Sequence, residues 1–365
     1  MFSYIIKRLL WFIPTLFVVS LFGFLLLSSS SDKAIQSYIS KPNTTHSQLT
    51  VEQQKNYWTH YLGFNLPLFY FSVKPLSNNK KEITHYIPSI KWHGTSNQYH
   101  CWLFGGNRSR GIIRGDFGIS YKTNEPVILI IKERVGWSLF FSITSILLAY
   151  VISIPLGIKL VTEPQSNFYR WTHRFLFFIY CLPPFFVGII LLMLFANSDV
   201  FNWLPASGIK PIEGYETDNL FNKITDTLPY IILPLICYTY SSLAFITRIT
   251  ESSINEQLHF DYIRTAKAKG LSHKSIVLNH ALKNGLLPLI TVFTSVFPSI
   301  IGGSVVIENL FSIPGMGNET VKSIIANDYP VVIAIITISS IITLLAYLLA
   351  DILYALVDKR INLNA

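Results

Sequence analysis

The sequence predicts an all-α polytopic membrane protein with six transmembrane helices and a large external (periplasmic) loop between helices 1 and 2. Three observations support this fold class: an apolar composition, six long stretches without charge, and the distribution of basic residues between them. Of the 365 residues, 50% are hydrophobic and 13% are charged, whereas soluble domains carry roughly 25% charged residues. A chain this apolar requires an apolar solvent, which indicates a membrane.

Six stretches of at least 21 residues contain no Asp, Glu, Lys or Arg. They are residues 9–31, 135–158, 175–198, 227–247, 284–307 and 329–350. A helix needs about 20 residues to cross the hydrocarbon core, so each stretch predicts one crossing. Interior prolines such as Pro183 and Pro184 are tolerated in membrane helices, because neighbouring helices can satisfy the freed carbonyls.

The first stretch has a second interpretation, since Lys7 and Arg8 precede it as they would in a signal peptide. Its apolar core covers residues 9–27, which is longer than the roughly 7–15 residues usual for such a segment. We therefore expect residues 1–31 to form an uncleaved N-terminal transmembrane helix.

Basic residues in short loops mark the cytoplasmic side of a membrane protein. One side would hold Lys7, Arg8, Lys159, Arg170, Arg174, the basic residues of 248–283, Lys359 and Arg360. The short loops on the other side would hold only Lys210, Lys223 and Lys322. The first side, with both termini, is therefore predicted to be cytoplasmic.

Residues 32–134 are predicted to form an external loop or small domain, although they hold thirteen basic residues, because long loops translocate largely regardless of charge. Residues 32–50 are polar and resemble a connector. Thr50 followed by Gln53 predicts a short capped helix, and the next part is ambiguous, with a small sheet as one option. Residues 126–140 predict an amphipathic helix leading into the second span. Residues 135–365 would then form a five-helix core.

The sequence lacks the signatures of several other function classes. No phosphate-binding G-x-x-x-x-G-K-[ST] motif occurs, so we expect no ATP hydrolysis by this chain alone. The six stretches hold no Asp, Glu, Lys, Arg or His, which argues against a proton relay, although backbone carbonyls could hold Na⁺. His93, His100 and Cys101 are loosely spaced and indicate a metal only weakly. The basic residues lie on both sides of the membrane, which argues against nucleic-acid binding.

A basic segment, "YIRTAKAKGLSHKSIVLNHALKNGLLP", separates two apolar stretches and contains five basic residues and no acidic one. It predicts two short helices joined at Gly270, which accepts a positive φ, with Ser272 as the N-cap of the second helix. Tyr262, Ala266 and Gly270 recur at i, i+4 and i+8 and would leave one low-profile face. Membrane topology alone explains part of the charge, but the small-residue face resembles a docking surface. The predicted cytoplasmic coupling loop covers residues 250–285.

At these residues the chain resembles the integral-membrane permease subunits of ATP-binding-cassette (ABC) importers, in the dipeptide and oligopeptide permease family. "MFSYIIKRLLWFIPTLFVVSLFGFLLL", "GDFGISYKTNEPVILIIKERVGWSLFFS", "VVIENLFSIPGMGNETVKSIIANDYPVV" and "DILYALVDKRI" are similar to further segments of that family, in the same order. The chain departs from the general importer pattern at Arg264, Thr265 and Ala266, as the peptide branch does. It also carries about 30–40 extra residues around residues 73–107.

The resemblance implies a binding-protein-dependent transport subunit in the bacterial inner membrane, which moves di- or oligopeptides. Its partners would be a homologous second permease subunit, two ABC ATPase subunits, a periplasmic or lipid-anchored substrate-binding protein, and membrane lipid, with no nucleic acid. ATP and Mg²⁺ would be bound by the ATPase partners, so no cofactor is expected in this chain. Dipeptides, longer peptides, nickel chelates and antimicrobial peptides all remain open as cargo.

The resemblance also implies two sets of site residues. The ATPase-coupling set is Tyr262, Arg264, Thr265, Ala266, Lys267, Ala268, Lys269, Gly270, Leu271 and Ser272. The set that would shape an external gate is Glu308, Phe311, Pro314, Gly315 and Gly317, for which a tight loop capping the helix bundle is an equal alternative. The rival functions are a secondary carrier or channel for a small polar solute, a membrane enzyme, and an anchor whose external loop binds a partner.

Overall fold

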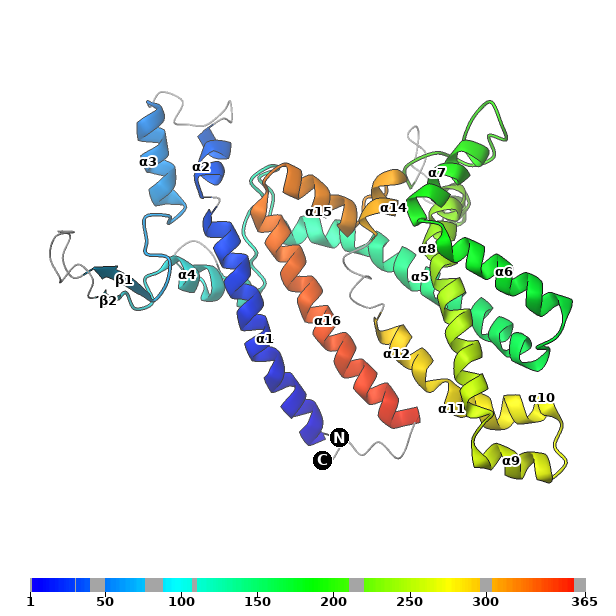
Figure 1. Cartoon of the computed structure of the whole chain (residues 1–365). Helices are drawn as coiled ribbons and strands as arrows, with labels where there is room; N and C mark the ends of the chain where they lie inside the picture. Colours follow the sequence, from blue (N-terminus) through cyan, green and yellow to red (C-terminus); the bar gives the residue numbers. More distant parts are fainter. Residues whose placement is uncertain are drawn as a thin grey trace. The chain divides into compact units, whose positions relative to one another are not determined.

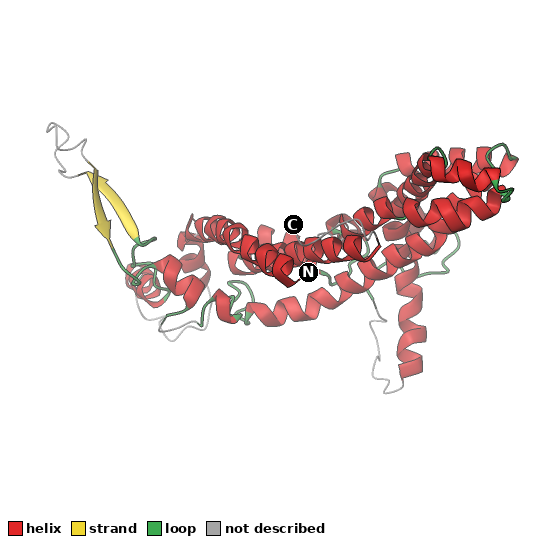
Figure 2. Cartoon of the chain, turned by 90° about the horizontal axis from the view of Figure 1, so that it is seen from below, coloured by secondary structure: helices red, strands yellow, loops and turns green. Residues whose placement is uncertain are grey.

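The computed structural model describes residues 2–29, 31–39, 50–75, 88–106, 110–209, 220–295 and 304–357. In these residues the regular structure is helical except for one two-stranded sheet (Figure 2). The chain forms two compact units. The first comprises residues 1–12, 134–321 and 339–365, and the second comprises residues 13–133 and 322–338.

Four helices are long and apolar enough to cross a membrane (Figure 1). They are α1 (Phe2–Ser29), α5 (Val127–Thr162), α8 (Leu220–Gln257) and α16 (Tyr329–Val357). In the described part of the chain the number of candidate crossings rises to six if each of two bent helix pairs makes one. The prediction of a helical, multi-pass membrane protein is therefore confirmed at this coarser level.

The first bent pair consists of α6 (Asn167–Cys181) and α7 (Pro184–Phe195), whose axes differ by 99°. The break falls at Leu182 and Pro183, both of which have extended backbone. A proline disfavours helical backbone at the residue before it and cannot donate a helical hydrogen bond, so two successive prolines end α6 and start α7. Residues 175–198, which were predicted to make one crossing, therefore belong to two helices joined at a bend.

The second bent pair follows the basic segment. It contains α10 (His273–Ile276), the π-helical turn η3 (Val277–Ala281), α11 (Leu282–Gly285) and α12 (Leu287–Ser295). The two halves of this pair meet at 47°. Residues 296–303 of the predicted span 284–307 lie outside the described residues, and α14 (Val305–Leu310) follows them.

In the first unit, α5 and α8 cross closely, and both the basic segment and the loop around Glu308 pack against them. A Cβ placed on Gly157 of α5 would lie 2.7 Å from the Cβ of Thr250 on α8, so the two helices touch at this point with no room for a larger residue. The Tyr150 hydroxyl donates a hydrogen bond of 2.6 Å to the Leu289 carbonyl, which attaches α12 to α5.

The second unit contains most of the predicted external segment. Its elements are α2 (Ser31–Ile39), α3 (Val51–Tyr61), β1 (Phe71–Pro75), β2 (Pro88–Trp92), α4 (Gln98–Phe104) and the 3₁₀ turn η2 (Ile112–Arg114). Thr50 and Gln53 form the expected capping box, and the small sheet is antiparallel. α2 lies where a connector was expected, and its buried Tyr38 stacks on Trp58 of α3.

A buried carboxylate also ties this unit together. Asp328, at the start of α16, accepts hydrogen bonds from the Ser120 hydroxyl and from the backbone N–H groups of Tyr121 and Lys122, the last two at 3.0 and 3.4 Å. α15 (Met316–Ile325) precedes it. The Asp328 side chain thus connects the predicted external segment to the start of α16.

Candidate functional site

The basic segment forms an elbow, defined here as residues 261–285, at the end of α8 (Figure 1). α9 (Asp261–Ala268) has Lys269 as its C-cap, and Gly270 follows with a φ of +78°. The Ser272 hydroxyl accepts a hydrogen bond of 3.3 Å from the Ser275 backbone N–H and starts α10. The predicted helix–glycine–helix pattern, with its C′ glycine and serine N-cap, is confirmed.

The inner face of the elbow packs against the ends of α5 and α8. The buried cluster there consists of Val161, Ile254, Ile263, Ala266, Ile276, Val277 and Ala281. Ala266 is 4% exposed, so its small side chain is used for contact within the chain. The prediction that Tyr262, Ala266 and Gly270 share one exposed low-profile face is wrong for Ala266, because the ends of the two long helices cover that side.

The outer face of the elbow combines cations with exposed apolar side chains. Lys267 and Lys269 are exposed, and Tyr262 and Leu271 are 38% and 39% exposed. Arg264 pairs with Asp261 at 3.0 Å, but both side chains are exposed and such a pair contributes little stability. The exposed side of the elbow therefore carries most of the predicted coupling residues.

The remaining predicted coupling residues also lie on the elbow's surface. Thr265, Ala268, Gly270 and Ser272 are exposed, and no atom of another residue lies within 4 Å of a Cβ built on Gly270. A hydrogen bond also joins the elbow to α8: the buried Ser253 hydroxyl of α8 donates to the Gly285 carbonyl at 2.8 Å. A force applied to the outer face therefore reaches α8 directly.

The second predicted set lies in a loop that we call the gate loop, residues 304–318, and its centre is Glu308. This carboxylate is fully buried. It accepts hydrogen bonds from the Ser138 hydroxyl of α5 at 2.8 Å, the Tyr238 hydroxyl of α8 at 3.2 Å and the Asn318 backbone N–H at 2.9 Å. Burial raises the pKa of the Glu308 carboxyl above its ordinary value, and these hydrogen bonds oppose that shift only in part.

The glycines of the gate loop make room for this carboxylate. A Cβ on Gly315 would lie 2.5 Å from the Glu308 carboxyl group, and one on Gly317 would lie 2.8 Å from the Val305 nitrogen. Phe311 is 2% exposed and packs with α5 and α8, while Pro314 is half-buried. The structure thus brings all five predicted gate residues into one compact loop.

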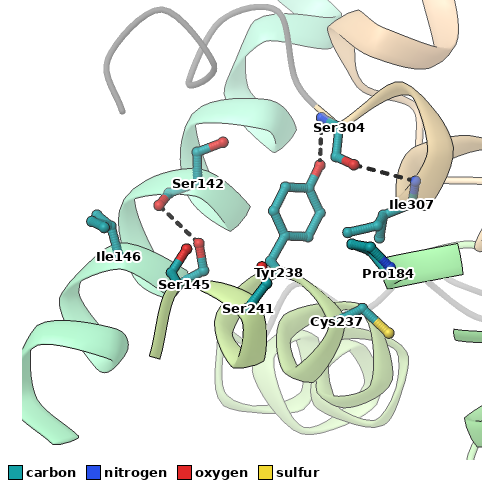
Figure 3. A pocket seen from close by; sticks show the side chains of 10 residues that line it. Ser142, Ser145, Ile146, Pro184, Cys237, Tyr238, Ser241, Ser304 and Ile307 are labelled. Carbon is teal, nitrogen blue, oxygen red and sulfur yellow. Dashed lines mark hydrogen bonds between the residues drawn. The ribbon is translucent and has the colours of Figure 1, made fainter. Parts of the chain in front are cut away.

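Beside the gate loop lies a cavity of about 200 Å³ between α5, α7, α8 and the loop (Figure 3). Its lining residues are Ser142, Ser145, Ile146, Pro184, Cys237, Tyr238, Ser241, Ser242, Ser304 and Ile307. Six of these residues carry a hydroxyl group, and none carries a charge. The sequence interpretation missed this site, because its serines come from separate charge-free stretches; the Ser241–Ser242 pair was the one local signal.

The histidines considered as weak metal ligands have other partners. Nε2 of His93 lies 2.8 Å from the Ser72 hydroxyl, and Nδ1 of His100 lies 2.9 Å from the Tyr70 hydroxyl. Within the described ranges, no group of three His, Cys, Asp or Glu side chains is arranged to hold a metal ion.

Together, the apolar helices, the basic elbow and the uncharged cavity define a membrane protein of the transport type. The family described as "Binding-protein-dependent transport system inner membrane component" matches residues 149–363. The chain belongs to this family. The match confirms the resemblance to permease subunits of ABC importers that the motifs indicated.

Several characterised relatives are similar over most of the chain. The oligopeptide transport system permease protein AppB of Bacillus subtilis is 38% identical over 73% of this chain and 80% of its own length. The peptidoglycan transport system permease protein YejB of Agrobacterium fabrum is 36% identical over 68% of this chain and 69% of its own length. The glutathione transport system permease protein GsiC of Escherichia coli K12 is 30% identical over 99% of both chains.

Proposed function

We propose that this chain is the transmembrane permease subunit of an ABC importer that moves di- or oligopeptides across the bacterial inner membrane. The names of its relatives support the peptide class, since they concern oligopeptides, peptidoglycan and glutathione. The uncharged cavity suits a path that does not select by side-chain charge. Cargo selection would then rest mainly with the external delivery protein.

The proposed complex contains a homologous second permease subunit, two ABC ATPase subunits and a periplasmic or lipid-anchored substrate-binding protein. ATP and Mg²⁺ would be bound by the ATPase subunits, so this chain would carry no ATPase site. In the proposed topology six helices cross the membrane, both termini are cytoplasmic, and residues 32–134 are external. Residues 1–31 would form the first crossing and residues 135–365 the five-helix core.

The elbow is the observation that carries this proposal. Its outer face offers Tyr262, Lys267, Lys269 and Leu271 to a partner, and its inner face is packed onto the ends of α5 and α8. Closure of the ATPase pair would move the elbow, and the elbow would move the helices between inward- and outward-facing arrangements. Such a switch requires that nucleotide binding favour one of two helix arrangements over the other.

The gate loop would act on the same two helices, farther from the elbow. Glu308 joins the loop to α5 through Ser138 and to α8 through Tyr238. A relative movement of α5 and α8 would therefore change the support of the loop. We propose that this is how the elbow's movement reaches the external gate.

The substitution Gly270→Trp tests the proposal. Gly270 has open space around it, so a large side chain would project outward and block docking of the ATPase. We expect the reconstituted complex to lose substrate-stimulated ATP hydrolysis, while membrane insertion remains normal. The matched control is Gly270→Asn, because asparagine tolerates the left-handed backbone and adds little bulk.

Normal coupled hydrolysis in the Gly270→Trp complex would remove the elbow from the mechanism. Peptide flux through the purified chain without ATPase subunits, driven by an ion gradient, would instead favour a secondary carrier.

A further inference from the structure

The cavity beside the gate loop contains hydroxyl groups whose hydrogen-bonding capacity the chain leaves open. Four threonine hydroxyls on α8, at positions 225, 239, 247 and 250, donate to carbonyls of their own helix; Thr239, for example, donates to the Leu235 carbonyl at 2.6 Å, and Thr247 donates to the Leu243 carbonyl at 2.8 Å. Among the described residues, Ser241 and Ser242 have no such partner for their hydroxyls, and they face the cavity instead. Hydroxyl groups that line a cavity and are left open in this way are available to a ligand.

The lining restricts the chemistry of a ligand. With no charged side chain in the wall, an ionised ligand group would lose its hydration without a counter-charge, which is costly. Serine hydroxyls both donate and accept hydrogen bonds, so they match a neutral group that offers an N–H and a carbonyl together. The peptide bond is such a group.

The size of the cavity limits how much of a ligand it can hold. At roughly 30 Å³ per water molecule, a volume of about 200 Å³ accommodates about seven waters. That space suits a short segment of backbone with small side chains. Ile146, Pro184 and Ile307 provide apolar surface beside the hydroxyls, as binding cavities usually do.

One wall of the cavity depends on the gate loop being in place. The Tyr238 hydroxyl accepts a hydrogen bond of 3.0 Å from the Ser304 backbone N–H (Figure 3). It also donates to Glu308 at 3.2 Å. Its ring stacks on Phe141 with centroids 5.7 Å apart, which fixes the wall. Ser304 and Ile307 belong to the loop itself, so displacing the loop opens the cavity.

We propose that this cavity is a binding subsite for an uncharged stretch of peptide backbone, and that the subsite exists only while the gate loop is docked through Glu308. The proposal rests on the peptide-import function above and adds where, and in which state of the loop, the chain itself contacts cargo. Bound backbone favours the docked loop, because a ligand stabilises the state that binds it.

The first test measures protection of the cavity in the complete transport complex. Ser242→Cys is introduced into a chain whose native cysteines at 101, 181 and 237 are replaced by alanine and whose peptide uptake is retained. The labelling rate by a small methanethiosulfonate reagent is then measured with and without acetyl-trialanine amide, an uncharged peptide. We expect labelling to slow several-fold, and to slow less with trialanine, whose termini are charged. Ser252→Cys, on the exposed side of α8, should label at an unchanged rate.

The second test measures ATP-driven uptake of an equimolar mixture of alanine peptides of two to six residues. The variant with Ser241→Ala and Ser242→Ala should raise the KM for peptide uptake several-fold. The control Thr239→Val removes a hydroxyl that is already bonded to its own helix and should leave KM unchanged.

The two tests separate the proposals. Normal uptake together with equal labelling in the presence and absence of peptide would overturn the subsite and leave the import function standing. A wild-type complex that takes up no peptide under ATP would overturn the import function itself. Protection of residue 242 that survives Glu308→Ala would contradict the dependence on the docked loop.

Discussion

The elbow and the gate loop both contact α8, the elbow at its C-terminal end and the gate loop at Tyr238 in its middle, and they differ in where they place their charged side chains. The elbow shows cations and apolar side chains to the outside, and its only buried part is the face toward α5 and α8. The gate loop hides its one charge, Glu308, and satisfies it with donors from its own chain. This difference supports the proposal that the elbow docks a partner subunit, whereas the contacts of the gate loop lie within the chain itself.

From this comparison we expect substitutions in the two regions to have different effects on stability and on assembly. Changes in the gate loop should lower the stability of the isolated chain, because they disturb internal contacts. Changes on the outer face of the elbow should leave that stability unchanged and disturb only the assembled complex. The predictions below run from the largest to the smallest expected loss of thermal stability.

Gly315→Val should destabilise most. Its side chain would overlap the Glu308 carboxyl group, forcing the loop away and leaving the buried carboxylate without its donors. We expect a loss of about 3 kcal/mol or more, at the upper end of overpacking effects. The thermal unfolding midpoint in detergent measures it. Gly136→Ala is the matched control, since nothing lies within 4 Å of a Cβ there and alanine favours a helix.

Glu308→Ala should come next. It leaves the Ser138 and Tyr238 hydroxyls and the Asn318 N–H without an acceptor, and each buried orphan costs about 1–3 kcal/mol. Glu308→Gln should lose less, because its carbonyl can serve Asn318 and each hydroxyl oxygen can accept from its amide group. Equal midpoints for the alanine and glutamine variants would show that the network is not what holds the loop.

The same pair gives a pH test. Because burial raises the folded-state pKa of Glu308 above its ordinary 4.5, the folded chain binds this proton more tightly than the unfolded chain. The stability from this group is therefore present at low pH and lost as the pH rises through the folded-state pKa. The midpoint of the wild type relative to Glu308→Gln should fall from pH 4.5 towards neutral pH. A wild-type midpoint that rises relative to that of Glu308→Gln over this range would contradict the direction of the pKa shift.

Ser272→Ala should have a smaller effect. It removes the N-cap of α10, for which about 1 kcal/mol is typical. We expect a small drop in the unfolding midpoint, with Ser272→Asp restoring it, since aspartate also caps helices well. If Ser272→Ala lowered the midpoint as much as Gly315→Val, the elbow would depend on this cap more than on its buried cluster.

The pair Lys267→Glu and Lys269→Glu should have no measurable effect on stability, because both side chains are exposed and have no ion-pair partner in the described residues. Co-purification with the ATPase subunits should nevertheless fall strongly. Lys283→Glu, on an exposed position of α11, is the charge-matched control and should retain the subunits. If both variants bound the ATPase equally, the outer face of α9 would not be the docking surface.

Local chemistry made some of these features predictable from the sequence. Gly270 and Ser272 each have one favoured position at a helix end, and Thr50 with Gln53 specifies a cap in the same way. The side of α9 that carries Ala266 could not be predicted, because it depends on α5 and α8, which are distant in sequence. Glu308 was identified as a site residue, but its partners Ser138 and Tyr238 lie 170 and 70 residues away.

The bend between α6 and α7 shows a different limit. Counting charges locates apolar segments well, but it gives no weight to backbone chemistry inside them. The sequence-based prediction accepts Pro183 and Pro184 inside a span, because neighbouring helices can satisfy the carbonyls that a proline leaves free. Two prolines in succession fix extended backbone at Leu182 and Pro183, and the chain turns through 99°.

The C-terminal half of α8 is free of helix-breaking residues. Its prolines, Pro229 and Pro234, both lie in the first half, and from Ser242 to Gln257 the helix contains neither proline nor glycine. That part is about 22 Å long at 1.5 Å per residue. The proposed peptide-binding serines lie at one end of this rigid part and the proposed ATPase-docking elbow at the other, so a rotation of the elbow would be transmitted to the cavity without a flexible segment between them.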